Sequence, residues 1–189
     1  MFRYLIVLAL VPYLPLAAWA DIIGQPRVID GDTLEIAGQR IRLHGIDAPE
    51  SKQLCRRNGE RWRCGKDATS ALKAFLGSRP VSCEELDRDR YRRIVAKCTV
   101  GRIDIGRWMV SEGWAMAYRR YSTDYVSNEA KARTARRGIW RGDFMPPWDW
   151  RKIVRDARRS RHLPQRQLAH RAAWGGRADL RGPTGRQVP

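Results

Sequence analysis

Apolar and polar residues alternate along the segment 40–46, so that Ile41 and Arg42 point to opposite faces of an extended chain. The segment 33–36 is also rich in residues that favour strands, and residues 37–39 link the two segments. A short link between two such segments is typical of a β-hairpin. We therefore predict that these two segments form a hairpin with one apolar face.

The remaining strands and helices are predicted from the same kinds of pattern. Strands are expected at residues 22–28, 80–85 and 94–100, and helices at about 66–76, 103–112 and 128–137. Five short strands with a helix after the third, followed by two more helices, fit a Greek-key barrel of the OB type. The expected fold class is therefore α+β and mainly β: a five-stranded OB-fold barrel with three helices.

Residues 1–20 have the pattern of a signal peptide. Arg3 supplies a positive charge, an apolar run extends from Tyr4 to Leu16, and Ala18-Trp19-Ala20 has the small-x-small form of a cleavage site. The apolar run is shorter than the roughly 20 residues of a membrane helix, and an uncleaved anchor is the alternative. We expect cleavage after Ala20, giving a secreted or periplasmic protein with no stable membrane insertion.

Residues 21–150 are expected to form one domain, followed by a basic tail over residues 151–189. The tail holds eleven Lys and Arg against two Asp. Residues 151–161 could extend as a short basic helix, whereas disorder is expected over residues 162–189, which lack apolar periodicity. Met145-Pro146-Pro147-Trp148 is interpreted as the point where the chain leaves the domain.

The chain is strongly basic, with a net charge of +17. A polyanion is therefore the natural partner, and we expect DNA and RNA to be bound electrostatically and without sequence specificity. Basic surfaces can also serve anionic lipids or solubility, so the charge narrows the class of partner and leaves the chemistry open.

Four cysteines follow the predicted leader, and an even count in an oxidising compartment indicates two disulfides. Cys83 and Cys98 lie on the two arms of a predicted hairpin, and Cys55 and Cys64 flank a short polar loop. Of the three possible connectivities, the local pairs Cys55–Cys64 and Cys83–Cys98 are favoured. A zinc site is the rival, but the cysteine spacings are not those of a zinc knuckle.

Three carboxylates meet if the first hairpin is correct. Asp30 and Asp32 lie in the turn that begins one arm, and Asp47 ends the other arm, so Asp32 and Asp47 should face each other. Clustered carboxylates repel unless they are protonated or bound to a cation, and all-oxygen ligation suits Ca²⁺ or Mg²⁺. The alternative is that Asp30 and Asp32 only form an Asx-turn, which Asp-Gly sequences often do.

Charged residues of other kinds accompany these carboxylates. Glu50 follows the cluster and could orient or deprotonate an attacking water. Arg42 lies between the acidic turns and could grip phosphate oxygens, although a surface ion pair is the alternative. A second basic group comes from the turn 88–93, where strand alternation allows only one of Arg92 and Arg93 to point at the cluster.

Three segments carry a specific resemblance to a known family. They are Val28-Ile29-Asp30-Gly31-Asp32-Thr33, Arg42-Leu43-His44-Gly45-Ile46-Asp47-Ala48-Pro49-Glu50 and Asp89-Arg90-Tyr91-Arg92-Arg93-Ile94-Val95-Ala96. In this order and at these separations they resemble the staphylococcal nuclease (thermonuclease) family. Glu112-Gly113-Trp114-Ala115 and Arg137-Gly138-Ile139-Trp140 also match, so the resemblance covers roughly residues 22–150.

The resemblance implies an OB-fold barrel and Ca²⁺-dependent hydrolysis of DNA and RNA that leaves 3′-phosphate ends. It implies that Asp32 and Asp47 bind calcium through their carboxylates and Ala48 through its backbone carbonyl, with Asp30 just outside these ligands. Glu50 is then the general base or the group that orients the water. Arg42 and Arg93 are then the residues that bind the phosphate and stabilise its transition state, so the resemblance selects Arg93 over Arg92.

Two positions depart from the family pattern, and three tyrosines are candidates for contact with substrate. Position 92 is Arg where the well-known family member has Gly, so the turn beside Arg93 is expected to change, and Ala48 replaces a Thr. Tyr91 is expected near the nucleotide or phosphate. Tyr118 and Tyr121 are candidates for base stacking.

Two functions are compatible with this pattern. The first is an exported endonuclease, expected to be a monomer. The second is a non-catalytic module that binds nucleic acid and has lost the chemistry. The second should lack some of the five key residue types, and all five are present: Asp32, Arg42, Asp47, Glu50 and Arg93.

Overall fold

The computed structural model describes residues 21–161. The predicted signal peptide, over residues 1–20, and the predicted disorder of residues 162–189 both lie outside the described residues. Within the described range, no helix combines the length and the apolar character needed to cross a membrane.

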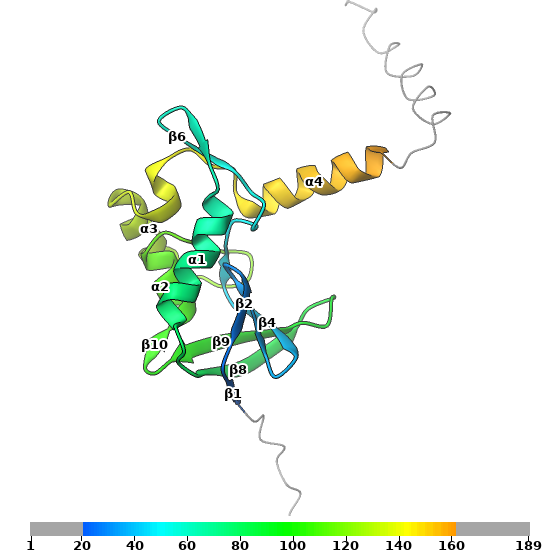
Figure 1. Ribbon diagram of the computed structural model, residues 1–189, viewed down its shortest axis with the longest axis vertical. Coiled ribbons are helices and arrows are strands. Elements are labelled where there is room, and N and C mark those ends of the chain that lie inside the picture. The colour runs from blue at the N-terminus through cyan, green and yellow to red at the C-terminus, as the bar shows by residue number, and fades with distance from the viewer. Residues whose placement is uncertain (1–20, 162–189) are drawn as a thin grey trace, which may run out of the picture.

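A curved, seven-stranded sheet forms the centre of the domain (Figure 1). Its strands are β1 (Ile22–Gly24), β2 (Arg27–Asp30), β3 (Thr33–Ile36), β4 (Gln39–Leu43), β8 (Val81–Arg88), β9 (Ile94–Val100) and β10 (Ile103–Asp104). The order across the sheet is β1-β8-β9-β4-β3-β2, with β10 paired to β9. Strands β4 and β9 run parallel, with Ile41 opposite Ile94, and the other neighbours in this sheet are antiparallel.

The two ends of this strand order belong to one segment of chain. Strand β1 pairs with β8 and strand β2 pairs with β3, and only Gln25 and Pro26 separate β1 from β2. Pro26 has no N–H to donate to a ladder, which explains why the predicted strand over residues 22–28 is interrupted. The sheet therefore curls so that one bent segment serves both edges, and the predicted α+β, mainly β fold of the OB type is confirmed.

Four α-helices and two small strand pairs lie outside the sheet in the described residues. The helices are α1 (Cys64–Leu76), α2 (Ile105–Ser111), α3 (Val126–Thr134) and α4 (Pro147–Arg161), with a 3₁₀-helix η1 (Gly138–Arg141) between the last two. The small pairs are β5 (Ile46–Asp47) with β11 (Met116–Ala117), and β6 (Cys55–Arg57) with β7 (Glu60–Trp62). The sequence predicted five strands and three helices, so the strand count and the helix count were both too low.

The core lies between the sheet and helices α1 and α2. Leu34 and Ile41 of the sheet, Leu72 and Leu76 of α1, and Met109 of α2 are each at most 1% exposed. Burying a side chain of this size stabilises the fold by about 1.5–3 kcal/mol. The apolar face predicted for the first hairpin is therefore the face that packs into this core.

Two disulfides are present, one within the main sheet and one between β6 and α1. Cys83 and Cys98 are register partners on β8 and β9 and are bonded to each other. Cys55, at the start of β6, is bonded to Cys64, the first residue of α1. These are the two local pairs that the sequence favoured. The second bond fixes the chain that follows Glu50 to the start of α1.

Helix α4 is the largest difference from the predicted organisation. It begins at Pro147 and continues to Arg161, so it crosses the predicted boundary between residues 150 and 151. The segment 151–161 is thus helical, as the sequence allowed. Figure 1 shows α4 extending away from the body of the domain.

Candidate active site

The turn between β2 and β3 orients the first two acidic residues. The backbone N–H of Asp32 donates to Oδ1 of Asp30 over 3.1 Å, which is the Asx-turn considered as the alternative. Asp32 nevertheless does more than close the turn. Its Oδ2 accepts a 3.0 Å hydrogen bond from the backbone N–H of Ala48, and Thr33 donates to its Oδ1. This turn therefore connects the start of one hairpin arm to the segment that follows the other.

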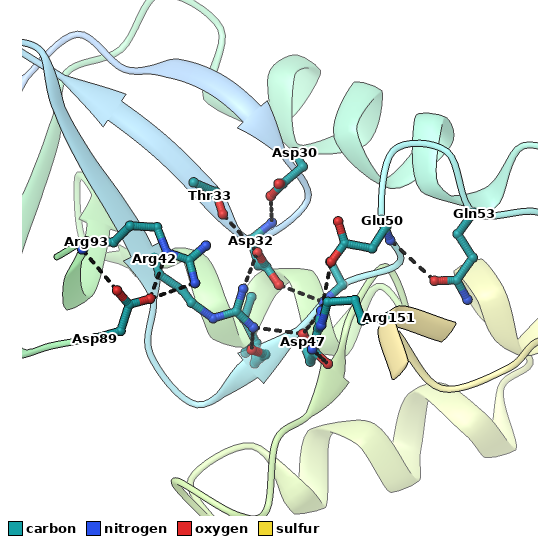
Figure 2. A network of polar contacts seen from close by, with 12 residues as sticks. Asp30, Asp32, Thr33, Arg42, Asp47, Glu50, Gln53, Asp89, Arg93 and Arg151 are labelled. Atoms are coloured by element: carbon teal, nitrogen blue, oxygen red, sulfur yellow. Dashed lines mark hydrogen bonds and ion pairs between the residues drawn. The ribbon is translucent and has the colours of Figure 1, made fainter. Parts of the chain in front are cut away.

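Arg42 joins the two carboxylates that the hairpin was predicted to bring together (Figure 2). Its Nη1 lies 2.7 Å from Asp32 Oδ1, and its Nη2 lies 2.7 Å from Asp47 Oδ1. The side chain of Asp47 is fully buried and that of Asp32 is 5% exposed. A buried carboxylate is costly unless it is paired and hydrogen-bonded, so this bridge stabilises the site.

A second guanidinium, which the sequence did not assign to the site, comes from α4. Arg151 Nη2 lies 2.7 Å from Asp47 Oδ2, and its Nη1 lies 2.9 Å from both Asp47 Oδ1 and Glu50 Oε1. Figure 2 shows Arg151 between Asp47 and Glu50. The only sequence signal was the basic character of residues 151–161, which does not distinguish Arg151 from its neighbours.

Burial and neighbouring charges shift the pKa values of Asp30 and Asp32 in opposite directions. Burial, followed by the negative charge of Asp32, raises the pKa of Asp30 to about 7. Burial also acts to raise the pKa of Asp32, but Arg42 and the hydrogen bond from Ala48 outweigh it and hold that pKa below its usual value. The ionised form of Asp32 is therefore favoured, whereas the protonated form of Asp30 is favoured more than in a free aspartate.

The carboxylate oxygens of the site are atoms that a hard cation could bind. In this structure, arginine side chains of the protein bind them instead. Among the residues that the structure describes, no three His, Cys, Asp or Glu side chains are grouped so that they could hold a metal ion. The expected three-carboxylate cluster is replaced by Asp32 and Asp47, whose oxygens Arg42 and Arg151 occupy. The two buried carboxylates offer oxygen atoms of the kind that a hard cation prefers, but Arg42 and Arg151 donate hydrogen bonds to them in this structure.

A buried glutamine fixes the turn that carries Glu50. Gln53 is 0% exposed, and its Oε1 accepts a 3.3 Å hydrogen bond from the backbone N–H of Glu50. Its Nε2 donates to the carbonyl of Met145 over 2.7 Å, just before α4 begins. Gln53 thus links the Glu50 turn to the base of α4. Sequence reasoning missed it because a glutamine in a polar loop resembles a surface residue.

Gly65, in the first turn of α1, lies directly against the same turn. A methyl group at this position would collide with the carbonyl oxygen of Glu50. We expect Gly65→Ala to displace Glu50, to reduce the free energy of unfolding by about 1–3 kcal/mol and to lower the nuclease activity that the sequence predicts. Urea unfolding and plasmid cleavage measure the two effects. Ser70→Ala, at an exposed position of the same helix, is the control; normal activity of Gly65→Ala would show that the turn does not position Glu50.

Asp89 holds the second basic residue of the predicted site. Its Oδ1 accepts hydrogen bonds from the backbone N–H groups of Tyr91 and Arg93, and its Oδ2 accepts a 2.8 Å hydrogen bond from Nε of Arg93. Because Ile41 pairs with Ile94, Arg93 immediately precedes the strand that lies beside the strand of Arg42. Figure 2 shows Asp89 and Arg93 on the Arg42 side of the network, away from Glu50.

Arg92 and Arg93 occupy different environments. Arg92 is exposed and has a φ of +62°, in the left-handed region that favours glycine. The backbone at position 92 thus keeps the conformation that a glycine would adopt. The side chain that bonds Asp89 is that of Arg93.

The three candidate tyrosines are not equally accessible. Tyr91 is 64% exposed, with the Arg93 guanidinium 5.7 Å from its ring centre. Tyr121 is 63% exposed and meets Tyr118 edge to face. Trp148 of α4 stacks on Tyr118, with ring centres 5.5 Å apart, and so covers one face that a base was expected to use. Contact of these tyrosines with substrate stays a prediction.

The described features define a class: an OB-fold protein with buried carboxylates and guanidinium groups gathered at one end of a hairpin. Residues 40–142 match the family described as staphylococcal nuclease homologue. The chain belongs to the staphylococcal nuclease family.

Several relatives with different names are similar to this chain in sequence. An uncharacterized endonuclease of Escherichia coli is 38% identical over 141 residues, which cover 70% of this chain and 86% of that protein. The micrococcal nuclease of Shigella flexneri is 32% identical over 173 residues, covering 79% and 91%. The succinoglycan biosynthesis protein ExoI of Rhizobium meliloti is 46% identical over 127 residues, covering 64% of this chain and 65% of that protein. The chain therefore spans slightly less than two thirds of the length of this last relative.

Proposed function

We propose that the protein is an exported, Ca²⁺-dependent endonuclease that hydrolyses phosphodiester bonds of DNA and RNA and leaves 3′-phosphate ends. The observation that carries the proposal is the bridge from Arg42 to the buried carboxylates of Asp32 and Asp47, with Glu50 linked to Asp47 through Arg151. Membership of the staphylococcal nuclease family supports nuclease activity, as do relatives named endonuclease and micrococcal nuclease.

In this proposal the cation is held by oxygen ligands alone. The carboxylates of Asp32 and Asp47 and the backbone carbonyl of Ala48 would hold Ca²⁺, with Asp30 beside them. When bound, the ion supplies positive charge that favours attack on the phosphate.

The side chains around this position have separate roles in the proposed reaction. Arg42 and Arg93 would bind the non-bridging phosphate oxygens and stabilise the charge that grows on them in the transition state. Arg42 uses three of its five N–H groups on Asp32, Ile46 and Asp47, which leaves two for a phosphate. Glu50 would orient the attacking water or accept its proton.

The remainder of the surface would hold the substrate without recognising its sequence. The net charge is +17, and Arg155, Arg158 and Arg159 of α4 are exposed. Contacts between basic side chains and phosphates release counterions, so affinity should fall steeply as salt concentration rises.

Export through the predicted signal peptide accounts for the disulfides. Cys55–Cys64 and Cys83–Cys98 would persist in a secreted or periplasmic protein and would be reduced in a cytosol. Thiol counting on the denatured, exported protein tests this part of the proposal. Four free thiols would contradict it.

Analysis of cleavage products tests the reaction against the alternative of a non-catalytic binding module. The purified chain from residue 21 onward is incubated with 5′-labelled DNA and RNA oligonucleotides in Ca²⁺. We expect both to be cut at many positions, to products whose mobility shifts after treatment with a 3′-phosphatase. Oligonucleotides that are bound but stay intact would favour the binding module, and products without 3′-phosphate would contradict the proposed bond cleavage.

A further inference from the structure

Arg151 reaches the site from far along the chain. It is separated from Asp47 by 104 residues, and its side chain is 26% exposed. It makes three hydrogen bonds: two to Asp47, as a two-pronged guanidinium–carboxylate pair, and one to Glu50. Pairs of this geometry are among the strongest charged hydrogen bonds in proteins. Arg151 is therefore an integral part of the site.

The contacts of Arg151 use the same atoms that a cation needs. Asp47 Oδ1 accepts hydrogen bonds from both Arg42 and Arg151, and Asp47 Oδ2 accepts one from Arg151. A carboxylate oxygen has about two lone-pair directions, so both directions of Oδ1 are already in use. A cation therefore cannot bind both oxygens of Asp47 while Arg151 stays in place.

Two contacts at the base of α4 hold Arg151 in this position. Trp148, three residues earlier on the helix, stacks on Tyr118. Gln53 binds the carbonyl of Met145, immediately before the helix. Residues three apart lie on the same side of a helix, so the side that docks Trp148 also presents Arg151 to the carboxylates. The docked position of α4 thus places Arg151 at the carboxylates.

We propose that Arg151 is a built-in competitor of the divalent cation: it neutralises Asp47 and Glu50 in the metal-free protein and must leave them when the ion binds. This inference rests on the proposed function only in taking Asp47 as a calcium ligand. Insertion of Arg151 and binding of Ca²⁺ oppose each other, so Arg151 weakens the affinity for Ca²⁺. It also stabilises the metal-free fold, since without it the buried Asp47 keeps only Arg42 as a charged partner.

Calorimetric titration of Ca²⁺ into the metal-free chain from residue 21 onward tests this competition without any measurement of activity. Arg151→Gln removes the competing charge, and we expect its Kd for Ca²⁺ to be lower by about tenfold or more. In chelator, we expect its melting temperature to be lower than that of the wild type, with a larger rise on adding Ca²⁺. Lys152→Gln removes the same charge at the next, exposed position of α4 and should leave both quantities close to wild type.

A second variant keeps the test decisive if Arg151→Gln does not fold without metal. Arg151→Lys keeps the charge, but one ammonium group cannot reproduce the paired hydrogen bonds to Asp47 together with the bond to Glu50. This variant should therefore bind Ca²⁺ more tightly than the wild type, by a smaller factor than Arg151→Gln. The proposed competition would be overturned if both Arg151 variants bound Ca²⁺ with wild-type affinity, or if Lys152→Gln lowered the Kd for Ca²⁺ as much as Arg151→Gln. Either result would leave the proposed function intact. Absence of Ca²⁺ binding in the wild type and in both variants would overturn the calcium part of the proposed function and this inference with it.

Discussion

Glu50→Gln is expected to lower kcat for plasmid cleavage by about 10²–10⁴-fold, the usual contribution of a general base. The amide keeps the size of the carboxylate but can neither accept a proton from water nor carry the negative charge that pairs with Arg151. The fold should survive, because the Glu50 side chain is 31% exposed and the turn is held through its backbone and Gln53. Steady-state cleavage and a thermal melt measure the two effects separately.

The matched control for this prediction is Glu84→Gln. Glu84 is exposed on β8, so its replacement makes the same change of charge and should leave kcat unchanged. Wild-type kcat in Glu50→Gln would remove Glu50 from the chemistry. A similar loss in both variants would show that net charge, and not this carboxylate, controls the rate.

Arg42→Gln is expected to lower both the stability of the fold and the rate of cleavage, and Ca²⁺ should restore only the stability. In chelator, the buried carboxylates of Asp32 and Asp47 lose the charge that bridges them, and the free energy of unfolding should fall by about 3–5 kcal/mol. Calcium should restore most of this stability, because an ion between the carboxylates replaces the missing charge. Cleavage should stay lower by about 10²–10³-fold, because the group that binds the phosphate is still missing.

Denaturant unfolding with and without Ca²⁺, alongside cleavage rates, checks this pattern. Arg40→Gln serves as the control, since Arg40 is exposed on the same strand, two residues away. If Ca²⁺ restored both stability and cleavage to Arg42→Gln, Arg42 would be a structural counter-ion with no role in the reaction. If Ca²⁺ restored neither, Asp32 and Asp47 would not be its ligands.

Local pattern was sufficient to predict the fold class and which charged residues of the first hairpin lie together. Period-two alternation over residues 40–46 identifies which side of the strand is buried, and this places Arg42 on the side opposite Ile41. Hairpin geometry then brings Asp32 and Asp47 together without any knowledge of the rest of the fold. The family resemblance alone selects Arg93 over Arg92, and in the structure it is Arg93 that donates hydrogen bonds to Asp89.

Local sequence patterns did not predict contacts between segments that are distant in the chain. Met145-Pro146-Pro147-Trp148 was interpreted as the exit from the domain, yet Trp148 stacks on Tyr118 and α4 returns Arg151 to the acidic residues. Prolines end local structure but do not determine where the following helix docks. Gln53 is a similar case, because it positions the Glu50 turn through hydrogen bonds to residues 50 and 145, which only the folded chain brings together.

Calcium dependence of plasmid cleavage is the decisive test of a calcium-dependent nuclease. Supercoiled plasmid is incubated with the purified chain from residue 21 onward in Ca²⁺, in excess chelator, and in chelator followed by added Ca²⁺. We expect nicking and linearisation in Ca²⁺, intact plasmid in chelator, and full recovery of cleavage when Ca²⁺ is returned. Equal cleavage in chelator, or intact plasmid under all three conditions, would contradict the proposed function.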